Sequence, residues 1–176
     1  MHYGIAIAQP DGTVAALSNH HQSFLSQELE GSSVEFRSPK EKPGAREFHV
    51  PDGHEIGEMT RTITREMCGT YFHGDANYHT NQESAKELGF QDVVVGGRMT
   101  LAYTARLLED FFRENWWTSG ELDLKFTNPV WCDDTVTVKG RLLGPHPTRL
   151  EALSCFVWIE KSNGTIALVA DASILA

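Results

Sequence analysis

The sequence predicts an α+β domain with several strands and one central, buried helix. Two patterns predict this fold class. Residues 99–112 have helical periodicity, with hydrophobic residues recurring at offsets of four, three and four. Residues 121–175 then contain strand-like segments separated by turn signals. A chain of 176 residues is long enough for one such domain, with a core that needs neither a disulfide nor a metal.

Residues 1–45 are expected to form an N-terminal extension, and residues 46–176 the main domain. The extension begins with two apolar segments that flank the turn signal Pro-Asp-Gly-Thr, a pattern typical of a hairpin. Residues 20–29 suit a short helix, and the polar residues 32–46, with two prolines, suit a linker or draped loop. The basic residues of that loop are candidates to contact ligand phosphates, although a solvated loop is the simpler interpretation: Arg37, Lys40, Lys42 and Arg46.

A first strand over residues 57–64 is expected to lead into short helical stretches at residues 65–72 and 83–88. The main helix follows the pair Gly96-Gly97. Its expected buried face consists of Leu101, Ala105, Leu108 and Phe112. The first half has no acidic residue, whereas the second half has a charged stripe of Arg106, Glu109, Asp110 and Arg113. We therefore expect the helix to begin deep in the protein and to emerge toward water.

The strands that follow the helix show alternating patterns. In residues 121–126, Leu122, Leu124 and Phe126 fall on one face and charged residues on the other. Further strands are expected over residues 135–143, 150–160 and 166–175. A sheet that wraps one helix still has an outer face and free edges, so we expect a partner subunit.

A polar segment between the two short helical stretches is the candidate catalytic site. Asp75 and His79 offer a carboxylate and an imidazole, which suit general acid and base catalysis if they share a cleft. In the alternative interpretation, Asp75 only shapes the loop and His79 is a surface residue. The start of the main helix has unpaired amides and the positive end of the helix dipole, and Gly96 and Gly97 would let a ligand approach them closely.

The segment from Gly74 to Thr100 resembles the MaoC-like family of (R)-specific enoyl-thioester hydratases and dehydratases. Six positions match the family motif in type and order: Gly74, Asp75, Asn77, His79, Ala85 and Gly97. The resemblance covers about residues 46–176 and implies a single hotdog fold, a curved antiparallel sheet wrapped around one long central helix. It also implies a homodimer or a higher homo-oligomer.

By this resemblance, Asp75 and His79 are the catalytic residues and Gly97 supplies the oxyanion hole. The supporting or substrate-binding positions are Asn77, Tyr78, Gly96, Arg98 and Met99. The implied reaction adds or removes water across the 2,3-bond of an acyl thioester carried by CoA or by the phosphopantetheine of an acyl carrier protein. No redox cofactor is expected, because hydration changes no net oxidation state, and the resemblance implies no metal.

The chain departs from the family motif at two places. Tyr78 alone separates Asn77 from His79, where the family has a proline and an apolar residue, so Asp75 and His79 are one residue closer together. Gly96 replaces the histidine that precedes the family's glycine. Two other functions therefore stay open, a hotdog acyl thioesterase and a non-catalytic thioester-binding or assembly subunit.

Composition excludes several classes of partner and site. The net charge of -9 argues against nucleic acid, because binding phosphate backbones needs a basic surface. No apolar run has membrane-spanning length, and the first residues lack a signal-like pattern. The three widely spaced cysteines Cys68, Cys132 and Cys155 suit a cytoplasmic protein with reduced thiols.

Three further groups of residues have two interpretations each. His73, Asp75 and His79 have the composition of a metal site, but three ligands within seven residues rarely converge. Trp116 and Trp117 suit either an acyl pocket or core and interface packing. Arg98 in the first helical turn either binds an acidic group of the substrate or reaches outward to Glu87 or Asp92.

Overall fold

The computed structural model describes residues 2–21, 48–72 and 77–176, and the chain divides into two compact units between residues 32 and 33. The first unit contains an antiparallel hairpin of β1 (His2–Ala8) and β2 (Val14–His21). Its turn includes Gly12 at φ 87°, a conformation that glycine adopts without steric cost. The short helix expected from residue 20 is wrong at its start, because His20 and His21 pair with β1, and the rest of it lies outside the described residues.

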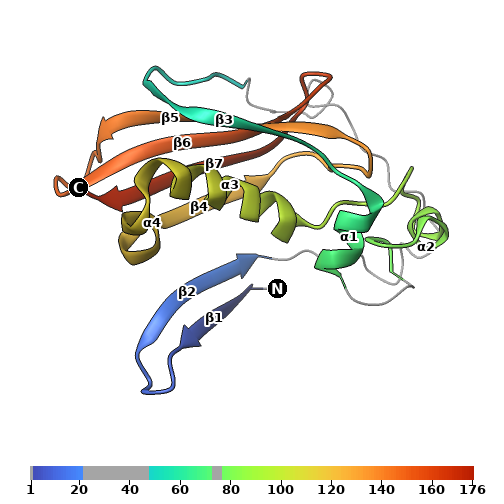
Figure 1. Ribbon diagram of the computed structural model, residues 1–176, viewed down its shortest axis with the longest axis horizontal. Coiled ribbons are helices and arrows are strands. Elements are labelled where there is room, and N and C mark those ends of the chain that lie inside the picture. Colours follow the sequence, from blue (N-terminus) through green and yellow to red (C-terminus); the bar gives the residue numbers. More distant parts are fainter. Residues whose placement is uncertain (1, 22–47, 73–76) are drawn as a thin grey trace. The chain divides into compact units, whose positions relative to one another are not determined.

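The second unit is built on a five-stranded antiparallel sheet with strand order β3-β5-β6-β7-β4. The strands are β3 (His54–Thr62), β4 (Glu121–Phe126), β5 (Thr135–Pro145), β6 (Ala152–Lys161) and β7 (Ile166–Leu175). The long helix α3 (Gly97–Phe112) runs along one face of the sheet and contacts β3, β5 and β6 (Figure 1). This is the arrangement of strands and helix that the sequence predicts.

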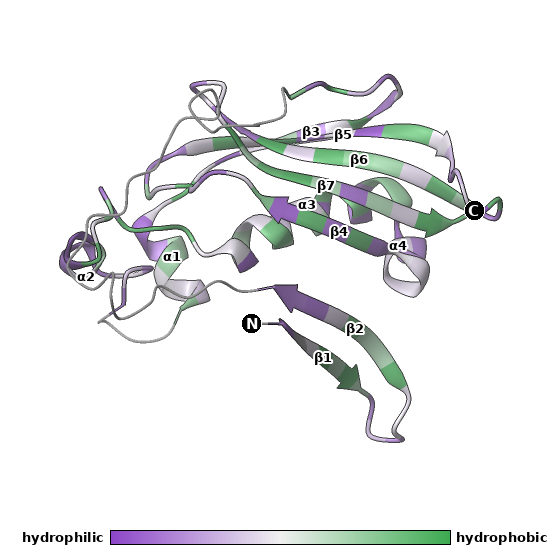
Figure 2. Ribbon diagram, turned by 180° about the vertical axis from the view of Figure 1, so that it is seen from behind, coloured by the Kyte–Doolittle hydropathy of each residue, from purple (hydrophilic) through white to green (hydrophobic). Residues whose placement is uncertain are grey.

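Alternation along the strands separates the face that packs on α3 from the outer face. Val136 and Val138 of β5 are fully buried, as are Val157 and Ile159 of β6, and all four belong to the core cluster. Figure 2 shows the hydrophobic residues that run along these strands. Gly140 marks a close approach, because a Cβ there would lie 2.6 Å from Cδ1 of Ile56. The apolar face of the sheet thus forms the core against α3.

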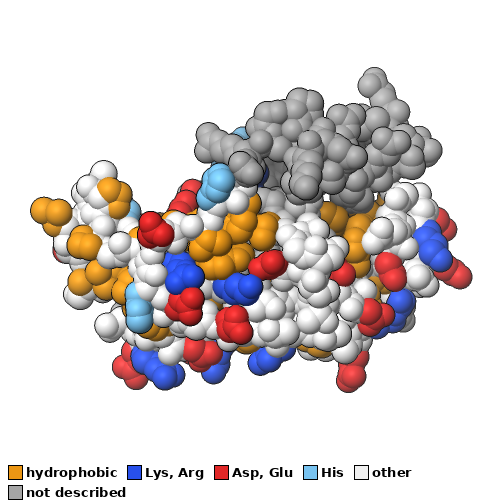
Figure 3. Space-filling view, turned by 90° about the horizontal axis from the view of Figure 1, so that it is seen from above, with side chains coloured by type: hydrophobic (Ala, Val, Ile, Leu, Met, Phe, Trp, Pro, Cys, Tyr) orange, Lys and Arg blue, Asp and Glu red, His pale blue; other side chains and the backbone are white. Residues whose placement is uncertain are grey.

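The outer face of the sheet is mixed in character, with hydrophobic side chains between charged ones (Figure 3). Trp158 is 5% exposed, and its ring centroid lies 6.0 Å from that of Phe156 and 6.2 Å from that of Phe48. Lys139 pairs with Glu160 on the neighbouring strand at 2.9 Å. Cross-strand pairs of this kind stabilise neighbouring strands.

The buried face of α3 differs from the one expected. Its buried residues are Met99, Thr100, Thr104, Leu107 and Leu108, whereas Leu101 and Ala105 are only half-buried. The two threonines are buried because each hydroxyl donates to a carbonyl one turn earlier in the helix, at 2.9 Å to Gly97 O and 3.1 Å to Thr100 O. A buried hydroxyl that is hydrogen-bonded in this way costs little. The face expected from hydrophobic residues alone is therefore rotated about the helix axis relative to the face that is buried in the structure.

Short helices precede and follow α3 in the chain. α1 (Arg65–Tyr71) is capped by Thr64, whose hydroxyl accepts from the Met67 amide, and α2 (Gln82–Glu87) is capped by Asn81. An unexpected helix, α4 (Glu114–Ser119), follows α3 directly, because Arg113 at φ 58° breaks the helical path between them. Trp116 of α4 packs in the core, whereas Trp117 is 63% exposed.

The apolar residues of the edge strand β4 are not all buried, although their alternation predicts that they share one buried face. Leu122 and Leu124 pack against the core, but Phe126 is 52% exposed. A Cβ at Gly97 would lie 2.8 Å from Cζ of Phe126, so this ring lies over the start of α3. Phe126 therefore belongs to the surroundings of the helix start and not to the core.

Two further expectations concern the cysteines and the membrane. Cys68, Cys132 and Cys155 are free thiols and all three are buried. Within the described part of the chain, no helix has both the length and the apolar character needed to span a bilayer.

Candidate functional site

The loop that carries His79 is shaped by Asn77. The Oδ1 atom of Asn77 accepts from the His79 amide at 2.8 Å, and its carbonyl accepts from the amides of Thr80 and Asn81 at 3.0 and 2.8 Å. An asparagine side chain that bonds its own backbone two residues on is typical of a tight turn. The turn directs His79 toward residues 93–95, where the Val94 amide donates to Tyr78 O at 3.0 Å.

The imidazole of His79 is held in one tautomer. Its Nδ1 atom lies 2.7 Å from the carbonyl oxygen of Val94, so a neutral ring donates Nδ1–H and keeps a lone pair on Nε2. Burial lowers the pKa of His79 below 6.5, and the nearby Arg98 cation lowers it further, while the bond to Val94 opposes both effects. A neutral imidazole with a free Nε2 is the form that can accept a proton at neutral pH.

His79 and Gly97 line the same cavity, which has a volume of about 680 Å³. Much of its wall is apolar, and includes the rings of Tyr78, Phe90 and Phe126. Thr100 and Asn128 add polar groups. None of the described residues that line the cavity is an Asp, Glu, Lys or Arg. An apolar cavity with a few convergent polar groups is typical of a small-molecule site.

The start of α3 supplies the unpaired amides of the cavity. α3 begins at Gly97 with Gly96 as its N-cap, and no side chain of a described residue caps it. The first amides of a helix have no partner within the helix and lie at the positive end of its dipole. Gly97 therefore offers a hydrogen-bond donor to an oxygen that develops negative charge.

The loop of residues 127–134, part of which the sequence identified only as a turn, forms one wall of the cavity through residues 127–130. The Val95 amide donates to Val130 O at 2.8 Å, and Trp131 forms an isolated bridge with Val94. Asn128 Nδ2 donates to Ile166 O at 2.7 Å. This wall therefore braces the segment whose carbonyl holds His79. The sequence could not show this role of the loop, because the loop and His79 are about fifty residues apart and meet only through tertiary contacts.

The remaining predicted site residues lie in different surroundings. Asp75 is outside the described residues. Met99 is fully buried in the core and does not line the cavity. Tyr78 lies against His79, with ring centroids 4.0 Å apart. Arg98 is exposed, and its guanidinium carbon lies 5.0 Å from the ring centroid of Phe72.

The structure also bears on two alternatives from the sequence analysis, the carboxylate partner of Arg98 and the metal site. Asp92, one carboxylate considered for Arg98, instead pairs with Arg65 at 3.6 Å. Among the described residues, no group of three His, Cys, Asp or Glu side chains is arranged to hold a metal. His73 and Asp75 of the metal alternative lie outside that part of the chain.

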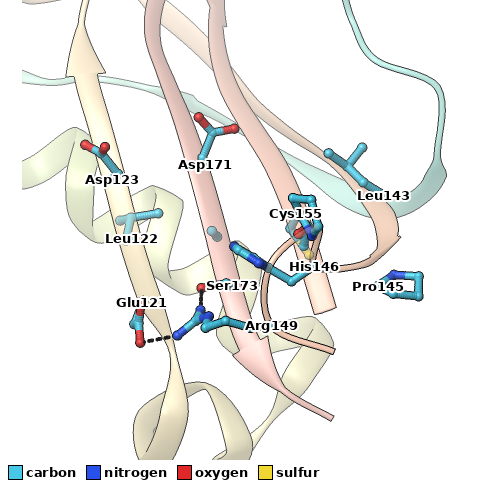
Figure 4. A pocket seen from close by; sticks show the side chains of 13 residues that line it. Glu121, Leu122, Asp123, Leu143, Pro145, His146, Arg149, Cys155, Asp171 and Ser173 are labelled. Carbon is cyan, nitrogen blue, oxygen red and sulfur yellow. Dashed lines mark hydrogen bonds and ion pairs between the residues drawn. The ribbon is translucent and has the colours of Figure 1, made fainter. Parts of the chain in front are cut away.

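A second cavity, of about 730 Å³, lies on the outer side of the sheet near the β5–β6 turn (Figure 4). Arg149 reaches over it and contacts both Glu121, at 2.7 Å, and Ser173. Asp123 and Asp171 face each other from neighbouring strands. None of the predicted site residues that the structure describes lines this cavity. His79 and Gly97 line the cavity at the start of α3 instead.

Comparison with known proteins identifies the family. The family model described as MaoC like domain matches residues 49–151, which is more than half of the chain. The chain belongs to the MaoC-like domain family. The family match includes the whole segment that carries the predicted site, from Gly74 to Thr100. No curated protein matched the chain.

Solved structures of MaoC-like proteins share the hotdog fold. The (R)-hydratase from A. caviae involved in PHA biosynthesis has a TM-score of 0.57 and 14% identity, covering 72% of this chain and 96% of that one. R-hydratase PhaJ1 from Pseudomonas aeruginosa has a TM-score of 0.57 and 19% identity, and the match covers 72% of this chain and 82% of that one. A chain of the ChsH1-ChsH2 complex from Mycobacterium tuberculosis has a TM-score of 0.58 and 16% identity, and the match covers 72% of this chain and 98% of that one. The prediction of an α+β hotdog fold is confirmed.

Proposed function

We propose that this MaoC-like protein adds water to, or removes it from, the 2,3-bond of an acyl thioester carried by CoA or an acyl carrier protein. One observation carries the proposal: His79, whose Nδ1 is bound to Val94 O and whose Nε2 makes no hydrogen bond with a described residue, lines the same cavity as the amide end of α3. A proton acceptor and an oxyanion donor in one cavity are what addition to a conjugated thioester requires.

In the hydration direction, His79 Nε2 takes a proton from water while the water oxygen bonds to C3 of the enoyl group. The electron pair of the 2,3-bond moves toward the thioester carbonyl, and the resulting enolate oxygen accepts a hydrogen bond from the Gly97 amide. A proton then returns to C2 and completes the 3-hydroxyacyl product. By family resemblance Asp75 works beside His79, and Asn77 supports the loop by bonding the His79 amide.

The character of the cavity wall supports an uncharged acyl group. The cavity presents aromatic and aliphatic side chains, and no carboxylate or basic side chain among the described residues lines it. Burying an unpaired carboxylate of a dicarboxylic acyl group against such a wall would be costly. Arg98, which is exposed near the start of α3, is in a position to meet negative charge on the carrier portion.

We also propose that the protein self-associates as a homodimer or a higher homo-oligomer. One similar structure is described as a complex of two chains, ChsH1 and ChsH2. In this chain β4 pairs only with β7, so its other edge is free among the described strands. Light scattering at micromolar concentration should give at least twice the 19.6 kDa of one chain. A monomeric mass would contradict this proposal.

A panel of enoyl, 3-hydroxyacyl and saturated acyl thioesters tests the function. Loss of the ultraviolet absorbance of the conjugated enoyl thioester, without release of free thiol, is the expected result. Release of thiol would instead indicate a thioesterase. Binding without turnover would indicate a non-catalytic subunit, an alternative that the shortened Asp75–His79 spacing favours.

Variants connect the activity to the proposed residues. Asp75→Asn and His79→Ala should each lower kcat by about a hundred- to ten-thousand-fold. Because groups that act as one unit lose most of their effect on the first removal, the double variant should be little worse than either single variant. A His79→Ala protein that turns over at the parent rate would remove His79 from the mechanism.

A further inference from the structure

The aromatic ring of Phe72 occupies a defined place at the end of α1. Phe72 is the C-cap of α1, and its amide donates to Cys68 O at 3.2 Å. The ring stacks on His79, with centroids 4.1 Å apart and planes inclined by 17°. Phe72 does not line the cavity, whereas His79 does. Phe72 therefore touches the proposed base without facing the substrate.

The stack restrains a motion that the hydrogen bond of His79 leaves free. A single bond from Nδ1 to Val94 O fixes one point of the imidazole but allows the ring to rock about that bond. Phe72 lies nearly parallel to the ring, and Tyr78 packs on it with an interplanar angle of 39°. The stack with Phe72 and the tilted contact with Tyr78 oppose rocking and so fix the direction of the Nε2 lone pair.

Gly96 provides the space in which Phe72 lies. An ideal Cβ at residue 96 would overlap Cε2 and Cζ of the Phe72 ring, so any side chain there would displace it. The backbone does not call for glycine, because Gly96 has φ −66° and ψ 135°, an extended conformation open to every residue type. The requirement at residue 96 is therefore for space, and Phe72 fills that space.

We propose that Phe72 is a positioning residue that aims His79 Nε2 at the substrate, and that Gly96 is glycine in order to admit its ring. The inference rests on the proposed role of His79 as the proton acceptor. Misplacing a catalytic group lowers the rate of the chemical step more than it weakens substrate binding. Phe72 should therefore affect kcat and leave KM almost unchanged.

The kinetic test replaces the flat ring with an aliphatic side chain. Phe72→Leu should lower kcat by about 10- to 100-fold, with KM within about twofold of the parent value. The matched control is Phe111→Leu on α3, which contacts the Phe112 ring, lies outside the cavity lining and should keep the parent kcat. An unchanged kcat in Phe72→Leu, or a loss confined to KM, would overturn the inference.

A variant cycle tests the relation between the two residues. Gly96→Ala should lower kcat in the parent protein, because the new methyl group displaces the Phe72 ring. In the Phe72→Ala background the same methyl group meets an empty space, so Gly96→Ala should cause no further loss of kcat. Equal losses in both backgrounds would show that residue 96 acts independently of Phe72 and would contradict the proposal.

A measurement without substrate separates this inference from the proposed function. An imidazole stacked on an aromatic ring has its carbon-bound protons shifted upfield in an NMR spectrum. The His79 signal, assigned by its loss in His79→Ala, should show that shift and move downfield in Phe72→Leu and in Phe72→Met. A signal unmoved in both variants would disprove the stack, even if the parent protein is an active hydratase. The expected movement would support the stack even if no thioester is turned over.

Discussion

The Nζ atom of Lys161, at the end of β6, lies 2.6 Å from Oδ2 of Asp134 in the loop that forms one wall of the cavity. The lysine side chain is only 8% exposed, and Nζ also donates to Pro129 O at 3.4 Å. The same Oδ2 accepts from the Trp131 amide at 2.8 Å. This ion pair ties the cavity wall to the sheet, and its disruption should affect stability strongly.

Lys161→Met should lower the free energy of unfolding by up to about 3 kcal/mol, because it leaves the Asp134 carboxylate without its counterion in a partly buried place. Replacing both residues, as Lys161→Met with Asp134→Leu, should cost less than the single change. Urea denaturation followed by circular dichroism measures both. The control is Lys139→Met, whose pair with Glu160 is more exposed and should contribute less than about 1 kcal/mol. Equal losses for Lys161→Met and Lys139→Met would contradict this account.

Burial is the main cause that lowers the pKa of His79 from its ordinary value of 6.5, and the Arg98 cation lowers it further. The acid limb of the kcat/KM profile should therefore lie below pH 6.5. Arg98→Gln removes the nearby positive charge and should move that limb to higher pH. A limb above 6.5 in the parent protein would contradict the neutral-imidazole assignment.

The same pKa shift affects stability. Between the lowered pKa of folded His79 and the value of 6.5 that it has when unfolded, the unfolded chain binds more protons than the folded one. The contribution of His79 to the free energy of unfolding should therefore decrease as the pH is lowered through that window. His79→Ala should flatten this part of the stability curve, and an identical slope in both proteins would argue against the shift.

Gly97→Val should reduce kcat/KM by about 10- to 100-fold, because a side chain at the start of α3 obstructs the approach to its amide. The fold should survive, since the three atoms nearest to the new Cβ all belong to Phe126, a residue that is 52% exposed and whose ring can turn toward water. The control is Gly69→Ala in α1, where a Cβ meets nothing within 4 Å. Thermal melting should show both variants folded. Full activity in Gly97→Val would remove Gly97 from the site.

The cysteines should react slowly with thiol reagents in the native protein. Burial raises the pKa of Cys155 to about 12 and that of Cys68 to about 11, and burial also raises the pKa of Cys132. Because the thiolate is the reactive form, a chromogenic disulfide reagent at pH 8 should release little colour until the protein is denatured. Denaturant should then expose all three thiols. Rapid reaction of one native thiol would show that its burial is incomplete.

Some boundaries of the elements followed from local signals in the sequence, whereas β3 begins three residues earlier than expected and ends two residues earlier. Helix α1 ends within one residue of its predicted end, and β4 and β7 occupy the predicted ranges, because alternation and turn residues act over a few neighbours. Helix α4 was missed, since nothing local shows that Arg113 adopts a positive φ. The expected buried face did not include Thr100 and Thr104, which can be buried because their hydroxyls are hydrogen-bonded within α3.

By itself, the sequence determined the fold class, the central helix and the candidate residues His79 and Gly97, because each of these depends on spacing within one segment. Only the tertiary structure decided which groups share the cavity. It paired His79 with the Val94 carbonyl, brought the loop of residues 127–134 against the start of α3, and placed the Phe72 ring in the space beside Gly96. Such contacts join residues distant in the chain and depend on the shapes of side chains, which no periodicity encodes.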